Sequence, residues 1–502
     1  MFSKILIANR GEIAVRVIRA CREMGIESVA VYSDADAHAL HTTLANQRVR
    51  IGPAAAAESY LSVEAIMGAA RATGAQAVHP GYGFLSENPD LPSACTDAGI
   101  TFIGPPADVI NSMGSKIGAR RLAQAAGVPV VPGETPGDQS DAAIVDAVRR
   151  VGFPVLLKPS EGGGGIGMKT VRDDASLANA IAQARREATG AFGDGTLYAE
   201  RLVEKPRHVE FQILADHHGN VVHLFERECS IQRRHQKVIE ETPSTAVTPA
   251  LRQRMGEAAV AIARAAGYRN AGTVEFLLDG AGDAARFYFL EMNTRLQVEH
   301  PVTEQVTGVD LVRAQIAVAS GERLLWGQDA LNQRGHAIEA RVYAEDPARH
   351  DLPQAGPLLL YREPSMPGIR VDAGVVEGSE VSVHYDPLLA KLIAWGETRE
   401  AARRRALAAL RSYPILGLRT NVALLVELLE HPRFIAGSID TGFLEEEGDA
   451  IRAGLSAETP PVVEAVADAA RAPRAGPMGS AEPGPSGPAT TDPWTSLRGV
   501  RV

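Results

Sequence analysis

The first 110 residues alternate short apolar runs with amphipathic stretches. Residues 4–8, 28–32, 75–79 and 101–103 are apolar runs of strand length. Between them, residues 12–24 carry Ile13, Val17 and Cys21 at helical spacing until Gly25, and residues 62–72 form a second helical stretch. Strands that alternate with helices predict a mostly parallel sheet with helices on both faces.

This first lobe is Rossmann-like in pattern but has no assigned nucleotide chemistry. Its first strand-to-helix turn, residues 9–12, lacks the three-glycine dinucleotide fingerprint, so we do not assign an NAD site. The glycine-punctuated loop His79–Glu87 follows a predicted strand. Its local chemistry leaves two interpretations open, because such a loop either borders a site or only makes a tight turn.

Residues 115–205 predict a small separate lobe around a glycine-rich hairpin. A helix begins at Lys116 and runs to about Gln124, and the strand 154–158 ends in Lys158. Four consecutive glycines, 162–165, then precede a strand at 168–171 and expose backbone N–H groups to phosphate oxygens. Met168 separates Gly167 from Lys169, which excludes the Walker A pattern. We interpret the segment as a flap over a nucleotide, the alternative being a plain hairpin turn.

Polar side chains follow on the next apolar runs. The strand 198–203 leaves the small lobe, and a strand edge between two lobes commonly supplies hydrogen-bonding groups to an adenine ring. The strand 208–214 carries His208 and Glu210. After another apolar run the chain has five polar or cationic side chains: Gln232, Arg233, Arg234, His235 and Lys237. A basic run is usually a solvated face, but apolar segments flank this one, so we predict anion binding.

Two further strands predict a hairpin that carries carboxylates. The strand 272–278 contains Glu275, and the strand 287–291 returns and ends in Glu291. Side chains alternate along a strand, so Asn293 shares a side with Glu291. Like charges on adjacent strands repel unless they are neutralised. We therefore predict that Glu275, Glu291 and Asn293 bind Mg²⁺ that bridges nucleotide phosphates.

The segment after this hairpin adds groups that suit a small planar anion. If the chain stays extended, Arg295, Gln297 and Glu299 continue the side of Glu291 and Asn293. A guanidinium beside an amide suits a small planar anion. The alternative is a surface loop with incidental charges.

Composition limits the class of protein. The chain has 502 residues, 45% hydrophobic and 22% charged, which predicts about three domains of a globular protein. Its net charge of −10 gives no support for nucleic acid or an anionic membrane as partner. No apolar run approaches the roughly 20 residues of a membrane span. Because residues 4–8 already form a strand, we expect no signal peptide, and the three cysteines suggest a reducing cytoplasm.

These motifs together resemble the biotin carboxylase component of biotin-dependent carboxylases, in the ATP-grasp superfamily. The resemblance covers about residues 1–447, and the segments 336–347 and 380–387 are most similar to subunits of acyl-CoA carboxylases, including the methylcrotonyl- and propionyl-CoA types. The matching segments, in chain order, are Ile7–Ala14, His79–Glu87, Lys158–Met168, Cys229–Lys237, Glu291–His300 and Glu339–Arg341.

The resemblance implies a role for each matching residue. The ATP-binding residues would be Lys116, Lys158, Gly163, Gly164, Gly165, Glu200, Arg201, Leu202, Val203, His208, Gln232, His235, Glu275 and Glu291. Glu275, Glu291 and Asn293 would hold Mg²⁺ or Mn²⁺. Bicarbonate would be bound by Lys237, Arg295, Gln297, Val298 and Glu299. Arg295, Glu299, Lys237 and Arg341 would be catalytic, with Glu299 as general base and Arg341 facing the ureido oxygen of biotin.

The resemblance also implies the architecture. The expected fold is α/β, with a Rossmann-like lobe at 1–114, an ATP-grasp domain at 115–330 that includes a flap lobe at about 130–204, and a C-terminal domain at 331–447. Residues 448–502 are expected to be a disordered linker and tail, because alanine, proline, glycine, serine and threonine dominate from 456 to 491.

The expected activity is ATP-dependent carboxylation of biotin by bicarbonate, the first half-reaction of an acetyl-CoA or acyl-CoA carboxylase in fatty acid biosynthesis. The chain has no Ala-Met-Lys-Met segment, so biotin is expected on a separate biotin carboxyl carrier protein. A carboxyltransferase and a second copy in a homodimer are the further expected partners. Two alternatives stay open: another ATP-grasp ligase of carbamoyl-phosphate or purine synthesis, and a nucleotide-binding scaffold that has lost catalysis.

The flap departs from the family pattern at two positions. Ile166 stands where the family generally has Arg or Lys, and Glu161 stands where Gly, Ala or Arg is common. The flap has therefore lost a cation and gained an anion, which predicts weaker closure over a polyphosphate and a raised KM for ATP.

Overall fold

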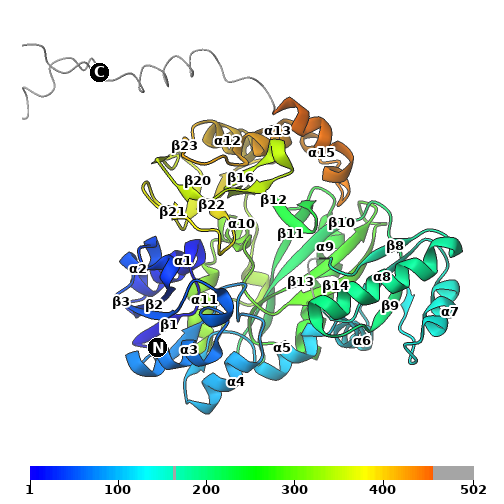
Figure 1. Cartoon of the computed structure of the whole chain (residues 1–502), viewed down its shortest axis with the longest axis horizontal. Coiled ribbons are helices and arrows are strands. Elements are labelled where there is room, and N and C mark those ends of the chain that lie inside the picture. The colour runs from blue at the N-terminus through cyan, green and yellow to red at the C-terminus, as the bar shows by residue number, and fades with distance from the viewer. Residues whose placement is uncertain (162–164, 456–502) are drawn as a thin grey trace, which may run out of the picture. The chain divides into compact units, whose positions relative to one another are not determined.

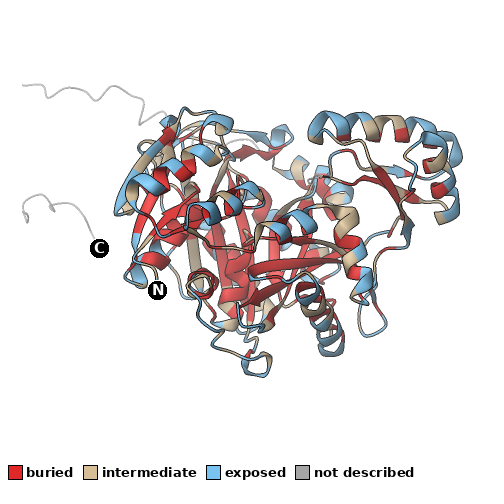
Figure 2. Ribbon diagram, turned by 90° about the horizontal axis from the view of Figure 1, so that it is seen from below, coloured by how far each residue is buried: buried red, intermediate tan, exposed pale blue. Residues whose placement is uncertain are grey.

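Three larger sheets organise the residues that the computed structural model describes, 1–161 and 165–455 (Figure 1). The strands of the central sheets are largely buried, and the helices turn exposed faces outward (Figure 2). The expected α/β class is confirmed. Within these described residues, no helix combines the length and the apolar character that crossing a membrane requires.

The N-terminal sheet is parallel, as the alternating pattern predicted. Its five strands lie in the order β3 (Gln47–Gly52), β2 (Glu27–Ser33), β1 (Lys4–Ile7), β4 (Ala77–His79) and β5 (Thr101–Phe102). Apolar side chains of α1 (Gly11–Glu23) and α11 (Leu311–Ala319) pack on one face of the sheet. Those of α3 (Val63–Thr73) and α4 (Asp90–Asp97) pack on the other. The predicted helices on both faces are therefore confirmed.

The small lobe is an antiparallel sheet that carries the glycine-rich segment between two of its strands. The strand order is β6 (Gly133–Glu134), β9 (Leu197–Arg201), β7 (Val155–Pro159) and β8 (Lys169–Val171). Helices α7 (Asp141–Val151) and α8 (Asp174–Phe192) contribute buried side chains to its core. The strand predicted over 198–203 ends at Arg201, so Leu202 and Val203 lie beyond it.

The largest sheet is antiparallel throughout. Its eight strands lie in the order β14 (Arg286–Asn293), β13 (Asn270–Asp279), β10 (Arg207–Ala215), β11 (Val221–Arg233), β12 (Gln236–Thr242), β15 (His336–Tyr343), β22 (Leu388–Gly396) and β20 (Ile369–Ala373). Helix α9 (Pro249–Ala265) packs on the β10–β14 part. The β15–β22 part packs on α12 (Arg399–Arg411), α13 (Val422–Glu430) and α15 (Phe443–Gly454).

Shorter elements complete the described fold. The helices are α2 (Leu40–Leu44), α5 (Ala107–Gly114), α6 (Lys116–Ala125), α10 (His300–Thr307) and α14 (Pro432–Ile435). Three two-stranded sheets pair β16 (Glu345–Asp346) with β17 (Leu352–Pro353), β18 (Gly356–Pro357) with β21 (Glu380–Val381), and β19 (Leu360–Tyr361) with β23 (Ile415–Leu416).

Ordered structure continues past the expected start of the linker at residue 448. Helix α15 runs to Gly454, and its Ile451 is buried. Arg452 of the same helix donates to Asp351 at 3.0 Å, so the helix is tied to the fold. The rest of the expected tail, residues 456–502, and the flap glycines Gly163 and Gly164 lie outside the described residues.

Candidate active site

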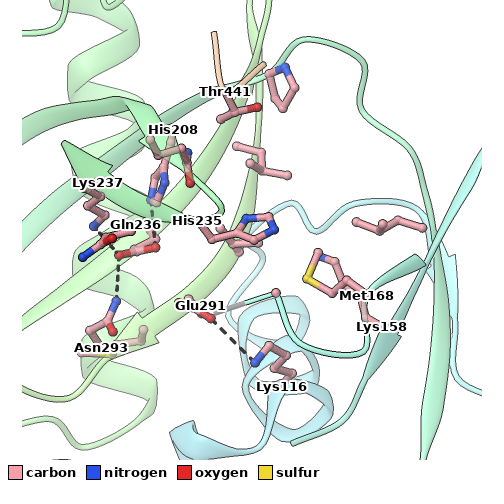
Figure 3. A pocket seen from close by; sticks show the side chains of 18 of the residues that line it. Lys116, Lys158, Met168, His208, His235, Gln236, Lys237, Glu291, Asn293 and Thr441 are labelled. Atoms are coloured by element: carbon pink, nitrogen blue, oxygen red, sulfur yellow. Dashed lines mark hydrogen bonds and ion pairs between the residues drawn. The ribbon is translucent and has the colours of Figure 1, made fainter. Parts of the chain in front are cut away.

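A single cavity of about 940 Å³ contains almost all of the predicted site residues. Its lining includes Lys116, Lys158, Gly165, Glu200, Arg201, Leu202, Val203, His208, Gln232, His235, Lys237, Glu275, Glu291, Asn293, Arg295, Gln297, Val298 and Arg341. Glu299 is fully buried directly behind Lys237 and Arg341. Figure 3 shows Lys237, His208 and Asn293 on one side of this cavity and Lys158 and Met168 on the other.

Lys158 reaches the cavity from the small lobe and is held by a buried carboxylate. It lies near the end of β7, and its Nζ is 2.6 Å from Glu200 Oε2 on the adjacent strand β9. Arg120 of α6 donates to the other oxygen of Glu200 and to the carbonyl of Val131. All three side chains are nearly buried, so the cation points into the cavity in a fixed place. Such a point charge suits a phosphate.

The described part of the flap contacts the opposite wall through Gly165. This glycine has φ +75°, and a Cβ there would overlap the imidazole of His235. A side chain at 165 would therefore be excluded both by backbone conformation and by contact. Ile166 follows, lines the cavity and has 48% of its surface exposed. Because its side chain is apolar, it offers no charge to a ligand.

Lys237 is the centre of a buried charge cluster. Its Nζ lies 2.5 Å from Glu210 Oε2, 2.7 Å from Glu299 Oε1 and 2.9 Å from Glu275 Oε1. Burial alone would lower the pKa of Lys237, but the three carboxylates outweigh it and raise that pKa well above its usual range. The lysine is therefore a permanent cation that holds three acids in one place.

Glu299 is placed by a turn rather than by an extended strand. Strand β14 ends at Asn293, and Glu299 precedes α10, whose second residue is Pro301. Proline is favoured in the first turn of a helix, so the chain turns here. The chain therefore does not stay extended, which was the condition for Arg295, Gln297 and Glu299 to share one side. The turn instead places Arg295 and Gln297 at the cavity and Glu299 just behind its wall.

The carboxylate of Glu299 is shared between two cations. Lys237 holds Oε1, and Arg341 Nη2 donates to Oε2 at 2.9 Å. Burial would raise the pKa of Glu299, but Lys237 and then Arg341 outweigh it and hold the pKa well below its usual range. Behind it, Arg341 Nε donates to Glu240 Oε1 at 2.6 Å. Burial raises the pKa of Glu240 to about 7 despite that contact.

Arg295 is fixed by the loop whose role the sequence left open. Its Nε donates to Glu87 Oε2 at 2.9 Å, and Nη1 donates to Gln297 Oε1 at 2.9 Å. Glu87 also accepts from the backbone N–H of Thr294 at 3.3 Å. Glu87 itself lines the cavity, so the loop His79–Glu87 borders the site. The guanidinium and the Gln297 amide form the planar pair that the sequence predicted for an anion.

The proposed metal ligands lie on neighbouring positions of the β13–β14 hairpin. Glu275 pairs with Glu291 and Thr273 with Asn293, so the hairpin and register that the pattern predicted are confirmed. Glu275 Oε1 accepts from Lys237, from Asn293 Nδ2 at 2.8 Å and from Gln297 Nε2 at 3.3 Å. Partial burial and then the nearby Glu275 raise the pKa of the Glu291 carboxyl.

A divalent cation fits this oxygen-rich corner. The two carboxylates repel each other, and a hard cation would offset that repulsion while taking the amide oxygen of Asn293. Among the described residues, the tightest sets of ligand atoms are instead His208, Glu210 and Glu275, and Glu210, Cys229 and Glu299. Lys237 already neutralises both of those sets, so the exposed side of Glu291 is the more favourable place for a cation.

The basic run 232–237 divides into cavity residues and scaffold. It does not follow a strand, because Gln232 and Arg233 belong to β11, Lys237 to β12, and Arg234 and His235 form the turn. Arg233 Nη1 is bound to Glu345 at 3.0 Å and Asp351 at 2.9 Å. Arg233 is therefore removed from the residues predicted to bind an anion, because its charge is paired with Glu345 and Asp351.

Sequence reasoning gave no role to several residues in or beside the cavity. Glu210 was noted on its strand without a role, although it binds both Lys237 and Arg227, the latter at 2.6 Å. Thr441 and Glu445, which sequence reasoning did not single out, line the cavity itself, as does Met168 of the flap segment. Thr441 precedes the last helix and gives no signal in the sequence, since a single threonine in a loop has no distinctive pattern.

Comparison with protein families divides the chain in three. The model for the biotin carboxylase N-terminal domain matches residues 1–110, and that for the biotin carboxylase C-terminal domain matches 339–446. The model for the carbamoyl-phosphate synthase L chain ATP-binding domain matches residues 115–326.

Three relatives illustrate the range of similar proteins. Biotin carboxylase of Halalkalibacterium halodurans is 51% identical over 88% of this chain and 97% of its own length. A pyruvate carboxylase component of Methanothermobacter thermautotrophicus is 51% identical over 92% of this chain and 93% of its own length. The alpha chain of the mitochondrial methylcrotonoyl-CoA carboxylase of Rattus norvegicus is 49% identical over 88% of this chain. The match spans only 62% of the length of that alpha chain.

Solved structures agree with this pattern. The biotin carboxylase domain of the 2-oxoglutarate carboxylase of Hydrogenobacter thermophilus, a dimer in complex with MgADP and bicarbonate, gives a TM-score of 0.86 at 44% identity. The match covers 90% of this chain and 99% of the Hydrogenobacter domain. Biotin carboxylase of Campylobacter jejuni in a nucleotide complex gives a TM-score of 0.86 at 42% identity, covering 89% of this chain and 99% of that one.

Proposed function

Because the chain belongs to the biotin carboxylase family of ATP-dependent ligases, we propose that it carboxylates biotin with bicarbonate and ATP through carboxyphosphate. The observation that carries the proposal is the buried carboxylate of Glu299, held between Lys237 and Arg341 at the wall of the same cavity that Lys116 and Lys158 line. A base, an anion site and phosphate-binding lysines therefore share one space.

The first step joins bicarbonate to phosphate. A bicarbonate oxygen attacks the γ-phosphate of ATP, the bond to ADP breaks, and Glu299 takes the bicarbonate proton. The low pKa of Glu299 keeps it deprotonated, and its fixed position between Lys237 and Arg341, rather than high basicity, suits it to take that proton. Arg295, Gln297, Lys237 and the backbone of Val298 would bind the bicarbonate, and Lys116 and Lys158 would offset charge on the phosphoryl group. Mg²⁺ or Mn²⁺ held by Glu275, Glu291 and Asn293 would supply further charge neutralisation there.

The second step transfers CO₂ to biotin. Carboxyphosphate breaks its C–O bond to give CO₂ and phosphate, the N1′ proton of biotin passes to that phosphate, and the nitrogen attacks CO₂. Arg341 would stabilise the negative charge on the ureido oxygen while N1′ is deprotonated. The flap residues Gly163, Gly164 and Gly165 would exclude water, which otherwise hydrolyses carboxyphosphate.

Nucleotide recognition would use the other end of the cavity. The segment Glu200, Arg201, Leu202 and Val203 would frame the adenine, with His208, Gln232 and His235 elsewhere on the nucleotide. This assignment is supported by the position of these residues between the small lobe and the large sheet. We also propose the domain division 1–114, 115–330 and 331–447, which the three family-model matches support.

The test is release of ADP by the purified full chain with free biotin. We expect ADP release that requires both bicarbonate and biotin, and that falls when either is omitted. Hydrolysis of ATP that ignores biotin would favour another ATP-grasp ligase. Binding of ATP with no turnover under any combination would favour a scaffold that has lost catalysis, and either result would overturn the proposal.

We further propose that the chain serves an acetyl-CoA or acyl-CoA carboxylase, with biotin on a carrier protein, a carboxyltransferase partner and a homodimeric carboxylase. The methylcrotonoyl-CoA carboxylase relatives support an acyl-CoA acceptor, and the dimeric structure from Hydrogenobacter thermophilus supports the dimer. Three buried free cysteines support a reducing cytoplasm. Fixation of radiolabelled bicarbonate by the complex from its own cells, offered acetyl-CoA, methylcrotonoyl-CoA, pyruvate or 2-oxoglutarate, tests the acceptor. If the label enters only pyruvate or 2-oxoglutarate and neither acyl-CoA, the proposed acyl-CoA acceptor is wrong.

A further inference from the structure

A fully buried lysine outside the cavity lining contacts the main chain beside the proposed base. Lys391 lies in the middle of β22, and none of its surface is exposed. Lysine is almost never fully buried unless it is paired. Its Nζ donates to the carbonyl oxygen of Val298 at 2.7 Å and forms an ion pair with Glu12 Oε1 at 3.1 Å. The mechanism above makes no use of this cation.

The strand register explains how Lys391 reaches that carbonyl. Lys391 is the cross-strand partner of Arg341, so both cations leave the same face of the sheet side by side. Two cations in such positions repel unless each has an anionic or carbonyl partner. Arg341 contacts the carboxylate of Glu299 and Lys391 contacts the carbonyl of Val298, the residue before it. Strand β15 therefore holds the side chain of Glu299 through Arg341, and strand β22 holds the backbone of Val298 through Lys391.

Glu12 completes the arrangement from the N-terminal lobe. It is the second residue of α1, where the helix dipole favours an anion, and only 4% of its surface is exposed. Its Oε1 faces Lys391 and also accepts from the hydroxyl of Tyr82 in the loop His79–Glu87. Burial raises the pKa of Glu12, and Lys391 opposes that effect. Glu12, in the motif at residues 7–14, is thereby connected through Lys391 to the turn that carries Val298 and Glu299.

We propose that Lys391, held by Glu12, is a positioning residue that fixes the peptide between Val298 and Glu299 and so aims the carboxylate of the base at bicarbonate. This inference rests on the proposed function. Strand β22 and helix α1 supply two anchors that are independent of the charge cluster around Lys237. The N–H of Val298, proposed to bind bicarbonate, belongs to the same short turn, so both bicarbonate contacts depend on this lysine.

The alternative is that Lys391 only neutralises Glu12 and holds the N-terminal lobe to the sheet. Its other anionic neighbour, Asp372 on β20, is already paired with Arg370 at 2.6 Å. The two roles separate in a charge-balanced double variant. Lys391→Met removes both the positive charge and the hydrogen bond to Val298, whereas Lys391→Met with Glu12→Gln also removes the unpaired buried anion. If neutralisation is the whole role, the double variant regains activity. If the lysine positions Val298, it stays as impaired as the single variant.

The experiment measures bicarbonate- and biotin-dependent ADP release by the full chain. For Lys391→Met we expect kcat/KM for bicarbonate to fall about 100-fold, the loss typical of misplacing a reacting group, with KM for ATP within about twofold. The double variant should show the same loss. The control is Arg252→Met, which breaks a buried pair with Glu226 at 2.6 Å on α9 away from the cavity. It should lower the thermal midpoint but keep kcat/KM for bicarbonate.

Further variants keep the inference testable if Lys391→Met does not fold. Glu12→Gln retains the lysine without its anion and should lower kcat/KM for bicarbonate by about tenfold, and Lys391→Arg should fall between that value and wild type. The inference is overturned if the double variant recovers kcat/KM for bicarbonate, or if Glu12→Gln and Lys391→Arg both keep the wild-type value. Either result would leave the proposed function intact. A wild-type chain without bicarbonate-dependent turnover would instead overturn the proposed function.

Discussion

The two ends of the cavity hold their charges in different ways. At the Glu299 end, Lys237 and Arg341 each contact at least two carboxylates within 2.9 Å, and the side chains involved are at most 12% exposed. At the other end, Lys116 lies 4.0 Å from Glu291, whose side chain is 37% exposed, and Ile166 is half exposed. The cations at the Glu299 end are paired before any ligand arrives. At the other end Lys158 is also fixed by Glu200, but Glu291 and Ile166 stay partly exposed and leave room for a large anion.

This difference matches the demands of the two proposed steps. Proton removal from bicarbonate needs a base and cations in fixed positions, because rearranging dipoles during reaction costs energy. A polyphosphate must enter and leave, so its binding groups are better placed on a lobe that closes after binding. The comparison predicts that substitutions at the Glu299 end change turnover, while substitutions at the flap change nucleotide affinity.

Removing the base should give the largest effect. Glu299→Gln keeps the size of the side chain but cannot accept a proton, so we expect kcat to fall about 10²–10⁴-fold. KM for ATP should stay near the wild-type value, because Glu299 does not line the nucleotide end. Steady-state ADP release measures both. The exposed Glu64→Gln on α3 is the control, and equal kcat values for both variants would remove Glu299 from its role.

A buried carboxylate on β12 should make a large contribution to stability. Glu241 on β12 accepts from Arg399 at 2.6 Å and contacts His336 at 2.7 Å, and only 1% of it is exposed. Burial would raise the pKa of Glu241, but His336 and Arg399 outweigh it and lower that pKa to about 2. At about 1.4 kcal/mol per pKa unit, Glu241→Gln should cost about 3 kcal/mol at neutral pH.

The pH dependence of this loss has a definite sign. The folded pKa is depressed, so the contribution of Glu241 is complete above its unfolded pKa, near 4.5, and disappears as the pH falls toward 2. Urea unfolding of wild type and variant should therefore converge as the pH is lowered. Glu400 has a pKa lowered to about 2 by Arg403 and Arg404 but is 45% exposed. Glu400→Gln should cost less than about 1 kcal/mol, and an equal cost would contradict the distinction between buried and exposed pairs.

The flap should give the smallest effect. Ile166→Arg restores a cation where the family generally has one, so we expect KM for ATP to fall by about threefold with kcat unchanged, a gain near that of an exposed ion pair. Leu325→Arg adds the same charge at a side chain that is 80% exposed and outside the cavity lining. If both variants bind ATP like wild type, the loss of the cation at residue 166 does not weaken nucleotide binding.

Local pattern was sufficient for the elements and for one part of the site. The hairpin that places Glu275 opposite Glu291 followed from two apolar runs and a turn, and the register confirms it. The parallel N-terminal sheet followed from alternating strands and helices. Both depend on neighbours in sequence, which is the information that spacing contains.

The remaining contacts depend on residues far apart in the chain. Glu240 and Arg341 meet because β12 pairs with β15, and Lys391 joins them from β22. The spacing of residues within one segment cannot predict which distant strands pair. Residues 295–299 do not stay extended for a local reason, because Pro301 favours a helix start there. That signal was present in the sequence and was outweighed by the alternation of polar residues.

The unbroken eight-stranded sheet bears on how this protein can be recombined. One family-model match ends at residue 326, between β14 and β15, and the next begins at 339, inside β15 itself. Strands β12 and β15 nevertheless share backbone hydrogen bonds across this boundary. A chimera joined there would strip β12 of its neighbour and leave a bare edge prone to aggregation. Engineers who wish to graft this catalyst onto other carriers should keep residues 1–455 as one cassette.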